Sequence, residues 1–385
     1  MTGFMPMRRA AVVAIAGAIV AWHAPAQAQN NKTVLIPCVC ELSGAGAVSG
    51  TNYRDGAHIA VNEINAAGGI LGHKIVMRDY DTQTNPMVSR ALVQKVVDAG
   101  AYVVMGTVYS GSTDVNMLVT EHAGVPQITG SEAPDITQKG DPYIFRTSSG
   151  SEKDIPALVD YFTQTLKVKK VAVEWVQNDF GKGGHDLFVQ AIRKAGVQVV
   201  ADVPSEQGQV DFSPDVAKIK HSGAQAVFVY INEEEAARFL KEAKKQSLTV
   251  PLVGDVTLTD QKVIELAGPA AEGAIAHVGL TVSAPVPSIQ AFVAKFRKIY
   301  HHNTDHNGIK GYIGVYAIKY VTEMIGKFDR KAFAAKMHGL TLDAKKYPGM
   351  LLTTSWDKTG ELSRESFMTQ VKGGKAVVIA TIPAN

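Results

Sequence analysis

Residues 170–203 read KVAVEWVQNDFGKGGHDLFVQAIRKAGVQVVADV, in which an apolar run, a polar loop, an amphipathic segment and a second apolar run follow one another. This order predicts a strand over residues 170–176, a helix near residues 184–195 and a strand over residues 197–203. Parallel strands that are joined through a helix form a right-handed crossover. The stretch therefore predicts part of a parallel sheet that is covered by helices.

The same alternation extends to both sides of this stretch and falls into two series. A chain of 385 residues is also long enough for two domains. The sequence therefore predicts an α/β fold with two doubly wound parallel-sheet lobes. The other predicted strands cover residues 34–37, 74–79, 102–105, 126–129, 226–231 and 252–254. The predicted helices include residues 55–67, 214–221 and 233–245, a helix from about residue 113 to Gly124, and a helix that Asn85 caps, Pro86 begins and Gly100 ends.

The last third of the chain has a different pattern. It predicts helices over residues 288–300 and 311–325, and then strands over residues 353–356, 366–371 and 376–382, with a hairpin turn at residues 372–375. We expect the chain to cross between the lobes near residues 147–149, 280–285 and 352–355, so that several crossing segments form a hinge. The predicted lobes comprise residues 29–148 with 281–352, and residues 149–280 with 353–385.

Residues 1–28 are typical of a cleavable secretory signal peptide. Arg8 and Arg9 give a basic leader, residues 10–22 are apolar and uncharged, and Ala26 and Ala28 form a small-x-small cleavage site. The apolar run is shorter than the roughly 20 residues that span a bilayer. No later stretch approaches that length, and no cysteine follows the cleavage site, so neither a membrane span nor a lipid anchor is predicted. We expect export to a bacterial periplasm.

Composition narrows the possible partners. Hydrophobic residues make up 46% of the chain and charged residues 19%, which is an ordinary globular balance. Without Arg8 and Arg9 the chain has 37 basic residues against 36 acidic ones, and this balance argues against a nucleic-acid partner. The two cysteines, Cys38 and Cys40, are interpreted as small buried core residues in preference to a disulfide or a metal site.

Polar and aromatic residues follow directly after several predicted strands. In open α/β sheets, ligands bind outside the carboxyl ends of the strands. The loop that contains Tyr109 and Ser110 also opens a helix, whose free N–H groups suit an anion. Ser112 and Thr113 are equally compatible with simple helix capping. The residues that follow predicted strands in this way are Tyr109, Ser110, Ser131, Glu132, Phe180, Asn232 and Asp255.

Signatures of enzymes and metal sites are weak. Residues 44–50 are rich in glycine, but the third glycine is one position late for a dinucleotide fingerprint, and a flexible loop lining a cleft explains them. The sequence has no Walker motif, nucleophile elbow or HExxH. His301, His302 and His306 are interpreted as a polar helix end, and residues 233–235 as a solvated first turn. No catalytic residue, cofactor or metal is predicted.

Several motifs together resemble a known family. They include Glu41-Leu42-Ser43-Gly44, the run from Asn62 to Gly72, Tyr80-Asp81-Thr82, Ser110-Gly111-Ser112-Thr113, Phe145-Arg146-Thr147, Asp179-Phe180-Gly181, Ala271-Glu272-Gly273 and Trp356-Asp357. In order and over nearly the whole mature chain, they resemble periplasmic solute-binding proteins of the branched-chain amino acid type. The resemblance implies a type I binding-protein fold, two lobes joined by three crossings, a small ligand between the lobes, and the permease and ATPase subunits of an ABC importer as partners.

The resemblance also implies roles for residues. It places the ligand carboxylate on the Ser110 hydroxyl and on the backbone N–H groups of Ser131 and Glu132, and it places a second-lobe aromatic at Phe180. Three positions depart from amino-acid binders. Asn232 and Ser49 stand where aromatic residues are typical, and Val256 stands where an acidic residue is typical, with Asp255 one position earlier. Tyr109, Phe180 and Tyr312 are candidates for contacts to an aromatic ring.

Because of these departures, the sequence does not decide between two classes of ligand. An α-amino acid is expected if Asp255 or Glu132 meets its ammonium group, and an aromatic or other amine-free organic acid is expected if neither does. A periplasmic sensor lobe that presents its ligand to a receptor is an alternative of another class. An enzyme is the third alternative, and the missing nucleophile and metal motifs argue against it.

Overall fold

The structure is a computed structural model that describes residues 1–3 and 32–384. Apart from residues 1–3, the predicted signal peptide lies outside the described residues. The compact unit considered below begins at Lys32. In the part of the chain that the structure describes, no helix combines the length and apolar character needed to cross a membrane.

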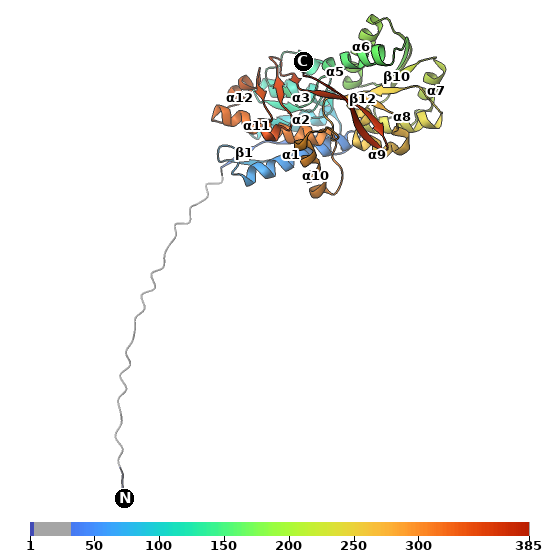
Figure 1. The fold of residues 1–385 in the computed structure, drawn as a ribbon. Coiled ribbons are helices and arrows are strands. Elements are labelled where there is room, and N and C mark those ends of the chain that lie inside the picture. Colours follow the sequence, from blue (N-terminus) through green and yellow to red (C-terminus); the bar gives the residue numbers. More distant parts are fainter. Residues whose placement is uncertain (4–31, 385) are drawn as a thin grey trace. The chain divides into compact units, whose positions relative to one another are not determined.

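The first lobe is built around a sheet of five parallel strands in the order β4–β2–β5–β6–β7 (Figure 1). A parallel pair, β1–β3, and a small antiparallel sheet, β13–β14–β15, complete it. Its strands are β1 (Thr33–Leu35), β2 (Cys38–Cys40), β3 (Lys74–Val76), β4 (Asp79–Asp81), β5 (Val104–Met105), β6 (Gln127–Thr129), β7 (Ile144–Arg146), β13 (Thr341–Leu342), β14 (Thr354–Trp356) and β15 (Leu362–Ser363). Its helices are α1 (Ala47–Ala66), α2 (Pro86–Asp98), α3 (Ser110–His122), α4 (Asp135–Gln138), α10 (Pro287–Tyr300), α11 (His306–Ile325) and α12 (Arg330–Met337).

The second lobe is built around seven strands in the order β17–β16–β12–β11–β10–β8–β9. β16 pairs in antiparallel fashion with both β12 and β17, and the other neighbouring strands pair in parallel. Its strands are β8 (Lys170–Val176), β9 (Gln198–Ser205), β10 (Ala226–Tyr230), β11 (Leu252–Gly254), β12 (Ile275–Val278), β16 (Ser366–Lys372) and β17 (Lys375–Ile382). Its helices are α5 (Ser151–Asp160), α6 (Asp179–Lys194), α7 (Ser213–His221), α8 (Glu233–Lys245) and α9 (Gln261–Ala267), with a 3₁₀ turn η2 (Val256–Thr259). The predicted class, α/β with two mostly parallel sheets, is confirmed.

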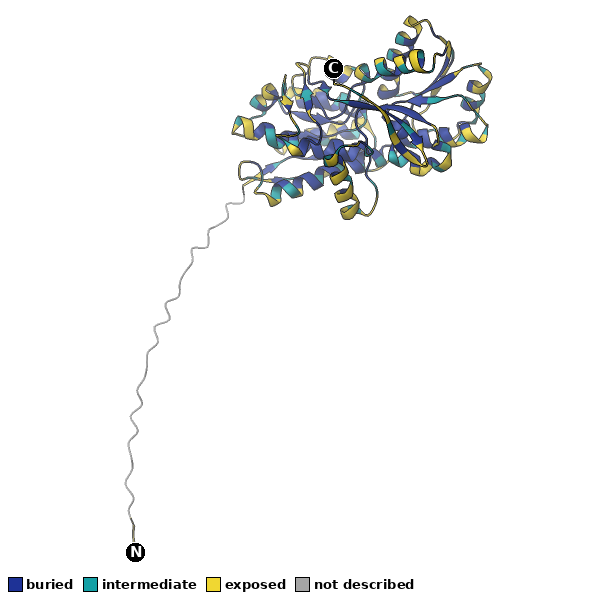
Figure 2. Ribbon diagram, viewed as in Figure 1, coloured by how far each residue is buried: buried dark blue, intermediate teal, exposed yellow. Residues whose placement is uncertain are grey.

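The second-lobe core follows from the pattern of its strands. All five residues of β10 are buried, as expected for a strand covered by helices on both faces. Phe188 of α6 stacks on Phe228 of β10 with ring centroids 3.8 Å apart. Figure 2 shows the central strands as buried and the outer sides of the helices as exposed, and the edge strand β17 is mostly exposed.

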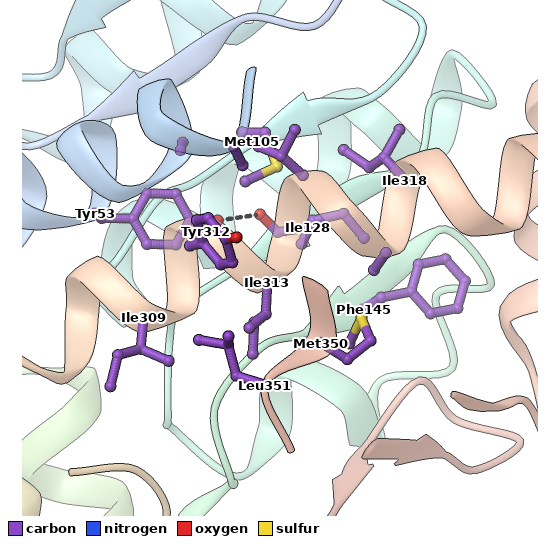
Figure 3. Packing of buried hydrophobic residues seen from close by; sticks show 14 of the residues in the cluster. Tyr53, Met105, Ile128, Phe145, Ile309, Tyr312, Ile313, Ile318, Met350 and Leu351 are labelled. Carbon is purple, nitrogen blue, oxygen red and sulfur yellow. Dashed lines mark hydrogen bonds between the residues drawn. The ribbon is translucent and has the colours of Figure 1, made fainter. Parts of the chain in front are cut away.

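In the first lobe, α1 and α11 pack directly against each other although they are far apart in sequence. A Cβ atom at Gly56 would lie 1.9 Å from the Gly308 carbonyl oxygen, so glycine permits this close approach of the two backbones. Beneath α11, the Tyr53 hydroxyl donates a hydrogen bond of 3.0 Å to the Ile128 carbonyl oxygen, which is drawn in Figure 3. The two helices therefore form one layer, and this layer packs on the sheet.

Two predictions about the first lobe were wrong. The predicted loop over residues 44–50 is mostly helical, because α1 begins at Ala47. A Cβ atom at Gly50 would lie 2.1 Å from the Glu41 carbonyl oxygen, so this glycine serves tight packing and not a flexible loop. Cys38 and Cys40 form a disulfide. Side chains two residues apart on a strand share a face, and the Cα atoms lie 5.9 Å apart, within the range that a disulfide spans.

Three segments join the lobes, and Arg364 connects all of them. It lies in the third segment, between β15 and β16. Its buried guanidinium donates from Nε to the Gly279 carbonyl oxygen (3.1 Å) in the second segment, and from Nη2 to the Thr147 carbonyl oxygen (3.0 Å) in the first. The third crossing was expected near residues 352–355 and follows β15, because β14 pairs with β13 and β15 pairs with β14 in the first lobe.

We expect Arg364→Ala to lower the free energy of unfolding by roughly 2–4 kcal/mol, because two buried carbonyl oxygens lose their donors. Urea unfolding measures this change. Arg364→Lys should fall between the wild type and the alanine variant, because lysine keeps the charge but lacks the planar fork of donors. The control is Arg193→Gln, which alters an exposed arginine of α6. Equal unfolding midpoints for Arg364→Ala and this control would show that the crossings do not depend on Arg364.

Candidate ligand-binding site

A pocket lies between the two lobes, and the roughly 360 Å³ of empty space in it includes space that is open to solvent. It opens at the carboxyl ends of β5 and β6 in the first lobe and of β10 and β11 in the second, which is where parallel sheets bind ligands. The first turns of α6, α8 and α11 also face it. The lining residues are Val108, Tyr109, Ser110, Gly130, Glu132, His306, Asn307 and Lys310 from the first lobe, and Phe180, Asn232, Glu233 and Thr257 from the second.

Five of the nine candidate residues inferred from the sequence line this cavity together. They are Tyr109, Ser110, Glu132, Phe180 and Asn232. Ser131, Asp255 and Ser49 are buried but are not part of the lining. Tyr312 is not part of it either.

Two of the candidate residues are engaged in contacts within the protein. The hydroxyl of Tyr312 donates to Glu63 Oε2 at 2.8 Å, and its ring packs against Phe292 in the first-lobe core. The backbone N–H of Ser131 donates to Thr129 Oγ1 at 3.1 Å, so it is already engaged within the protein.

The first turn of α3 presents unoccupied backbone donors to the cavity. The N-cap residue is Tyr109, and no side chain caps the helix. Thr113, an alternative cap in the sequence, instead bonds the hydroxyls of Thr129 (2.9 Å) and Ser131 (2.6 Å) beneath the cavity. Because the first N–H groups of a helix have no partner within it, the α3 terminus beside Ser110 can accept an anion.

Glu41 holds the loop that leads into α3. Its carboxylate accepts hydrogen bonds from the backbone N–H groups of Val108 (3.1 Å) and Tyr109 (3.2 Å). Complete burial raises the pKa of Glu41 to about 7, although these two hydrogen bonds act in the opposite direction. The position of two lining residues therefore depends on a buried carboxyl group.

Lys310 is a buried cation in the cavity wall. Its ammonium group donates to Glu132 Oε1 at 2.7 Å and to the Gly130 carbonyl oxygen at 3.3 Å. Only 2% of the lysine is exposed, so its charge requires this partner. Lys310 and Glu132 together contribute no net charge to the cavity.

Asp255 lies next to the cavity with one oxygen unused. Its Oδ1 accepts from the backbone N–H (3.3 Å) and the hydroxyl (2.7 Å) of Thr257, whereas its Oδ2 is buried and has no partner among the described residues. Burial raises the pKa of Asp255 well above its usual value, and the negative charge of Glu132 raises it further. Two carboxyl groups from different lobes therefore act on each other at this side of the cavity.

The first turn of α8 is buried, contrary to the prediction of a solvated turn. Glu233 is only 6% exposed and lines the cavity beside Asn307 of α11. Asn307 Nδ2 donates to Glu233 Oε1 at 3.4 Å. Burial raises the pKa of Glu233, whereas the nearby His306 and the Ser49 hydroxyl act to lower it.

A second contact between the lobes lies beside Glu233. His306 Nδ1 and Asp260 Oδ2 are 2.8 Å apart, and both side chains are buried. His306 belongs to α11 in the first lobe, and Asp260 caps α9 in the second. The lobes are thus in polar contact on this side of the cavity.

Sequence reasoning missed the residues that α11 contributes, namely His306, Asn307 and Lys310. The helix was expected to begin at residue 311 but begins at His306. The signal was Asp305, whose Oδ1 accepts from the N–H groups of Asn307 (2.8 Å) and Gly308 (3.1 Å) as an N-cap.

Comparisons with known proteins agree on one family. The family model described as "Periplasmic binding protein" matches residues 33–376. The Leu/Ile/Val-binding protein homolog 3 of Brucella melitensis biotype 1 is 28% identical over 339 residues, which are 87% of this chain and 90% of that protein.

Solved structures show the same fold. The branched-chain amino acid transporter substrate binding protein LivJ from Streptococcus pneumoniae, in complex with isoleucine, aligns with a TM-score of 0.82 and 23% identity over 92% of this chain and 99% of its own. A solute binding protein of an ABC transporter from R. palustris, in complex with benzoate, aligns with a TM-score of 0.83 and 23% identity over 92% and 97%.

The raised pKa of Glu41 predicts a pH dependence of stability. A carboxyl group with a pKa near 7 in the folded state and about 4.5 when unfolded stabilises the fold most at low pH, and this contribution is lost as the pH rises through 7. Relative to Glu41→Gln, the wild type should lose roughly 2–3 kcal/mol of unfolding free energy between pH 5 and pH 8. Urea unfolding of both proteins across this range measures the difference, and parallel pH curves would contradict it.

Proposed function

This chain belongs to the periplasmic binding protein family, and on that premise we propose that it is the exported solute-binding component of an ABC importer and binds an α-amino acid between its lobes. The permease and ATPase subunits of that importer are its partners, and the periplasm is its compartment. Relatives that match most of the chain bear the names of Leu/Ile/Val-binding proteins. No residue of the cavity is assigned a catalytic role.

The ligand carboxylate is assigned to the first lobe. Ser110 lines the cavity and begins α3, so its hydroxyl and the first N–H groups of the helix face the same space. A carboxylate at this terminus interacts favourably with the helix dipole and with unpaired donors.

The ligand ammonium group is assigned to the space between Glu132 and Asp255. The unpartnered Oδ2 of Asp255 carries this assignment, because a buried carboxylate oxygen without a donor is costly. The adjacent charge of Glu132 makes the site more negative, and Lys310 offsets only one of the two carboxyl groups. An ammonium group supplies both the donors and the positive charge that this position needs.

Ligand binding is coupled to closure of the lobes. Glu132 and Ser110 belong to the first lobe and Asp255 to the second, so one amino acid contacts both only when the lobes are together. A ligand stabilises the state for which it has more contacts, and this preference drives closure around the hinge.

An amine-free aromatic acid is a second candidate, and Lys310 is the observation that favours it. A buried lysine in the wall is a potential partner for a ligand carboxylate, and the rings of Tyr109 and Phe180 offer apolar contact. In that case Lys310 would turn from Glu132 to the ligand, which leaves Glu132 and Asp255 without a cation.

Ligands that differ only in the ammonium group separate the two candidates. Each L-amino acid of a panel is compared with its deaminated acid in thermal-shift and calorimetric titrations. We expect an amino acid to stabilise the protein by roughly 2.7 kcal/mol at a hundredfold excess over its Kd, and its deaminated counterpart not to do so. Asp255→Asn should weaken amino-acid binding about tenfold or more, whereas Asp98→Asn, at an exposed position of α2, should not. Equal binding of both members of each pair would favour the aromatic or organic acid.

Binding should also release protons. A cation placed beside Asp255 lowers the pKa of this carboxyl group, which burial and Glu132 hold high in the unliganded protein. Titration calorimetry near pH 6 in two buffers of different ionisation enthalpy should therefore show net proton release, and Asp255→Asn should reduce it. Identical heats in the two buffers would argue against an ammonium group at this position.

A further inference from the structure

Beyond the proposed carboxylate and ammonium positions, polar side chains from both lobes stand in the wall of the cavity. Asn307 and Lys310 lie three residues apart on α11 and therefore share one face of the helix. Glu233 meets Asn307 from the second lobe one turn away from the Lys310–Glu132 pair. We call Glu233 and Asn307 the distal pair.

Asn307 presents a free acceptor in this wall. The residue is fully buried, and its Oδ1 has no partner among the described residues. Its Nδ2 faces two carboxylates, Glu233 Oε1 at 3.4 Å and Asp305 Oδ2 at 3.5 Å. Turning the amide over would place its oxygen against both carboxylates, so electrostatics determine which amide atom is left without a partner.

The distal pair lies in a negative environment. Glu233, Asp260 and Asp305 lie close together here, and the nearby basic side chain of His306 pairs with Asp260. All four are buried. Buried carboxylates need donors and compensating charge, and Asn307 gives Glu233 only one long hydrogen bond.

An aliphatic ligand side chain cannot donate a hydrogen bond to the polar groups of this wall. It would cover the Asn307 oxygen and the Glu233 carboxylate without supplying a donor, and covering an unpaired buried polar group is unfavourable. The apolar and aromatic side chains in the lining are those of Val108, Phe180 and Tyr109. The wall thus differs from a pocket suited to leucine, isoleucine or valine.

We propose that the ligand is an α-amino acid whose side chain ends in an N–H donor that binds Glu233 and Asn307 Oδ1. The excess of carboxylates favours a cationic amino or guanidinium group over a neutral amide. This inference rests on the proposed function, because it assigns only the side-chain end of an amino acid bound in the same cavity.

Near-isosteric ligand pairs test the proposal on the unaltered protein. L-lysine is compared with L-norleucine, and L-asparagine with L-leucine, by titration calorimetry. The donor-bearing member of at least one pair should bind at least tenfold more tightly than its apolar partner. A gain for lysine alone indicates a cation, and a gain for asparagine indicates an amide. Binding of norleucine or leucine at least as tight as that of its partner would overturn the proposal.

Two glutamate variants test whether the ligand contacts Glu233 directly. Glu233→Gln should weaken binding of the preferred donor-bearing ligand at least tenfold. The matched control is Glu234→Gln, which removes the same charge from the same turn of α8, at a position where Glu234 is 3.5 Å from Arg238 and does not line the cavity. An equal effect of both variants would contradict a direct contact with Glu233. If Glu233→Gln does not fold, the ligand pairs still decide the question.

The outcomes separate this inference from the proposed function. If leucine or norleucine binds best and its deaminated analogue does not bind, the proposed amino-acid function holds and only the distal contact is refuted. If deaminated acids bind as well as amino acids, the ammonium position fails, and the assignment of the ligand class fails with it.

Discussion

Arg364 bonds the Gly279 and Thr147 carbonyl oxygens, and by doing so it holds the three segments that join the lobes at one point. This contact bears on the site, because two separate sheets can line one cavity only if their carboxyl edges face each other. A buried arginine suits this position, since its planar group donates in two directions at once. The cavity is the space that remains between the two sheet edges.

The second constraint is that charge buried between two lobes needs a partner. Lys310 meets Glu132, His306 meets Asp260, and Asn307 donates to Glu233. Two acceptors around the cavity remain outside these contacts, the Oδ2 of Asp255 and the Oδ1 of Asn307, neither of which has a partner among the described residues. A ligand with two donor groups would supply a hydrogen bond to each of these acceptors. The polar atoms of the cavity therefore indicate the chemistry of the ligand more specifically than the apolar surface of the cavity does.

The sequence was informative where a local rule sufficed. Alternating strands and helices predicted both sheets, and the carboxyl-end rule found Ser110, Glu132, Phe180 and Asn232 because each directly follows a strand or begins a helix. Lys310 and Asn307 were missed because apolar periodicity begins later in α11 than the helix itself, and only the cap at Asp305 marks its start. Glu233 was misjudged because an acidic first turn suits the helix dipole whether it is solvated or buried. The Cys38–Cys40 pairing depends on backbone geometry, which residue spacing does not determine.

The oxidation state of the Cys38–Cys40 pair depends on the compartment in which the protein folds. The disulfide closes so short a loop that the chain-entropy relation gives it only about 1.6 kcal/mol, less than the roughly 3 kcal/mol of a 15-residue loop. The fold therefore gains little from the bridge, which forms and persists only under oxidising conditions. A molecule retained in a reducing cytosol would fold with two buried thiols, and the oxidation state of this one pair of sulfur atoms would record whether the chain had left the cell interior.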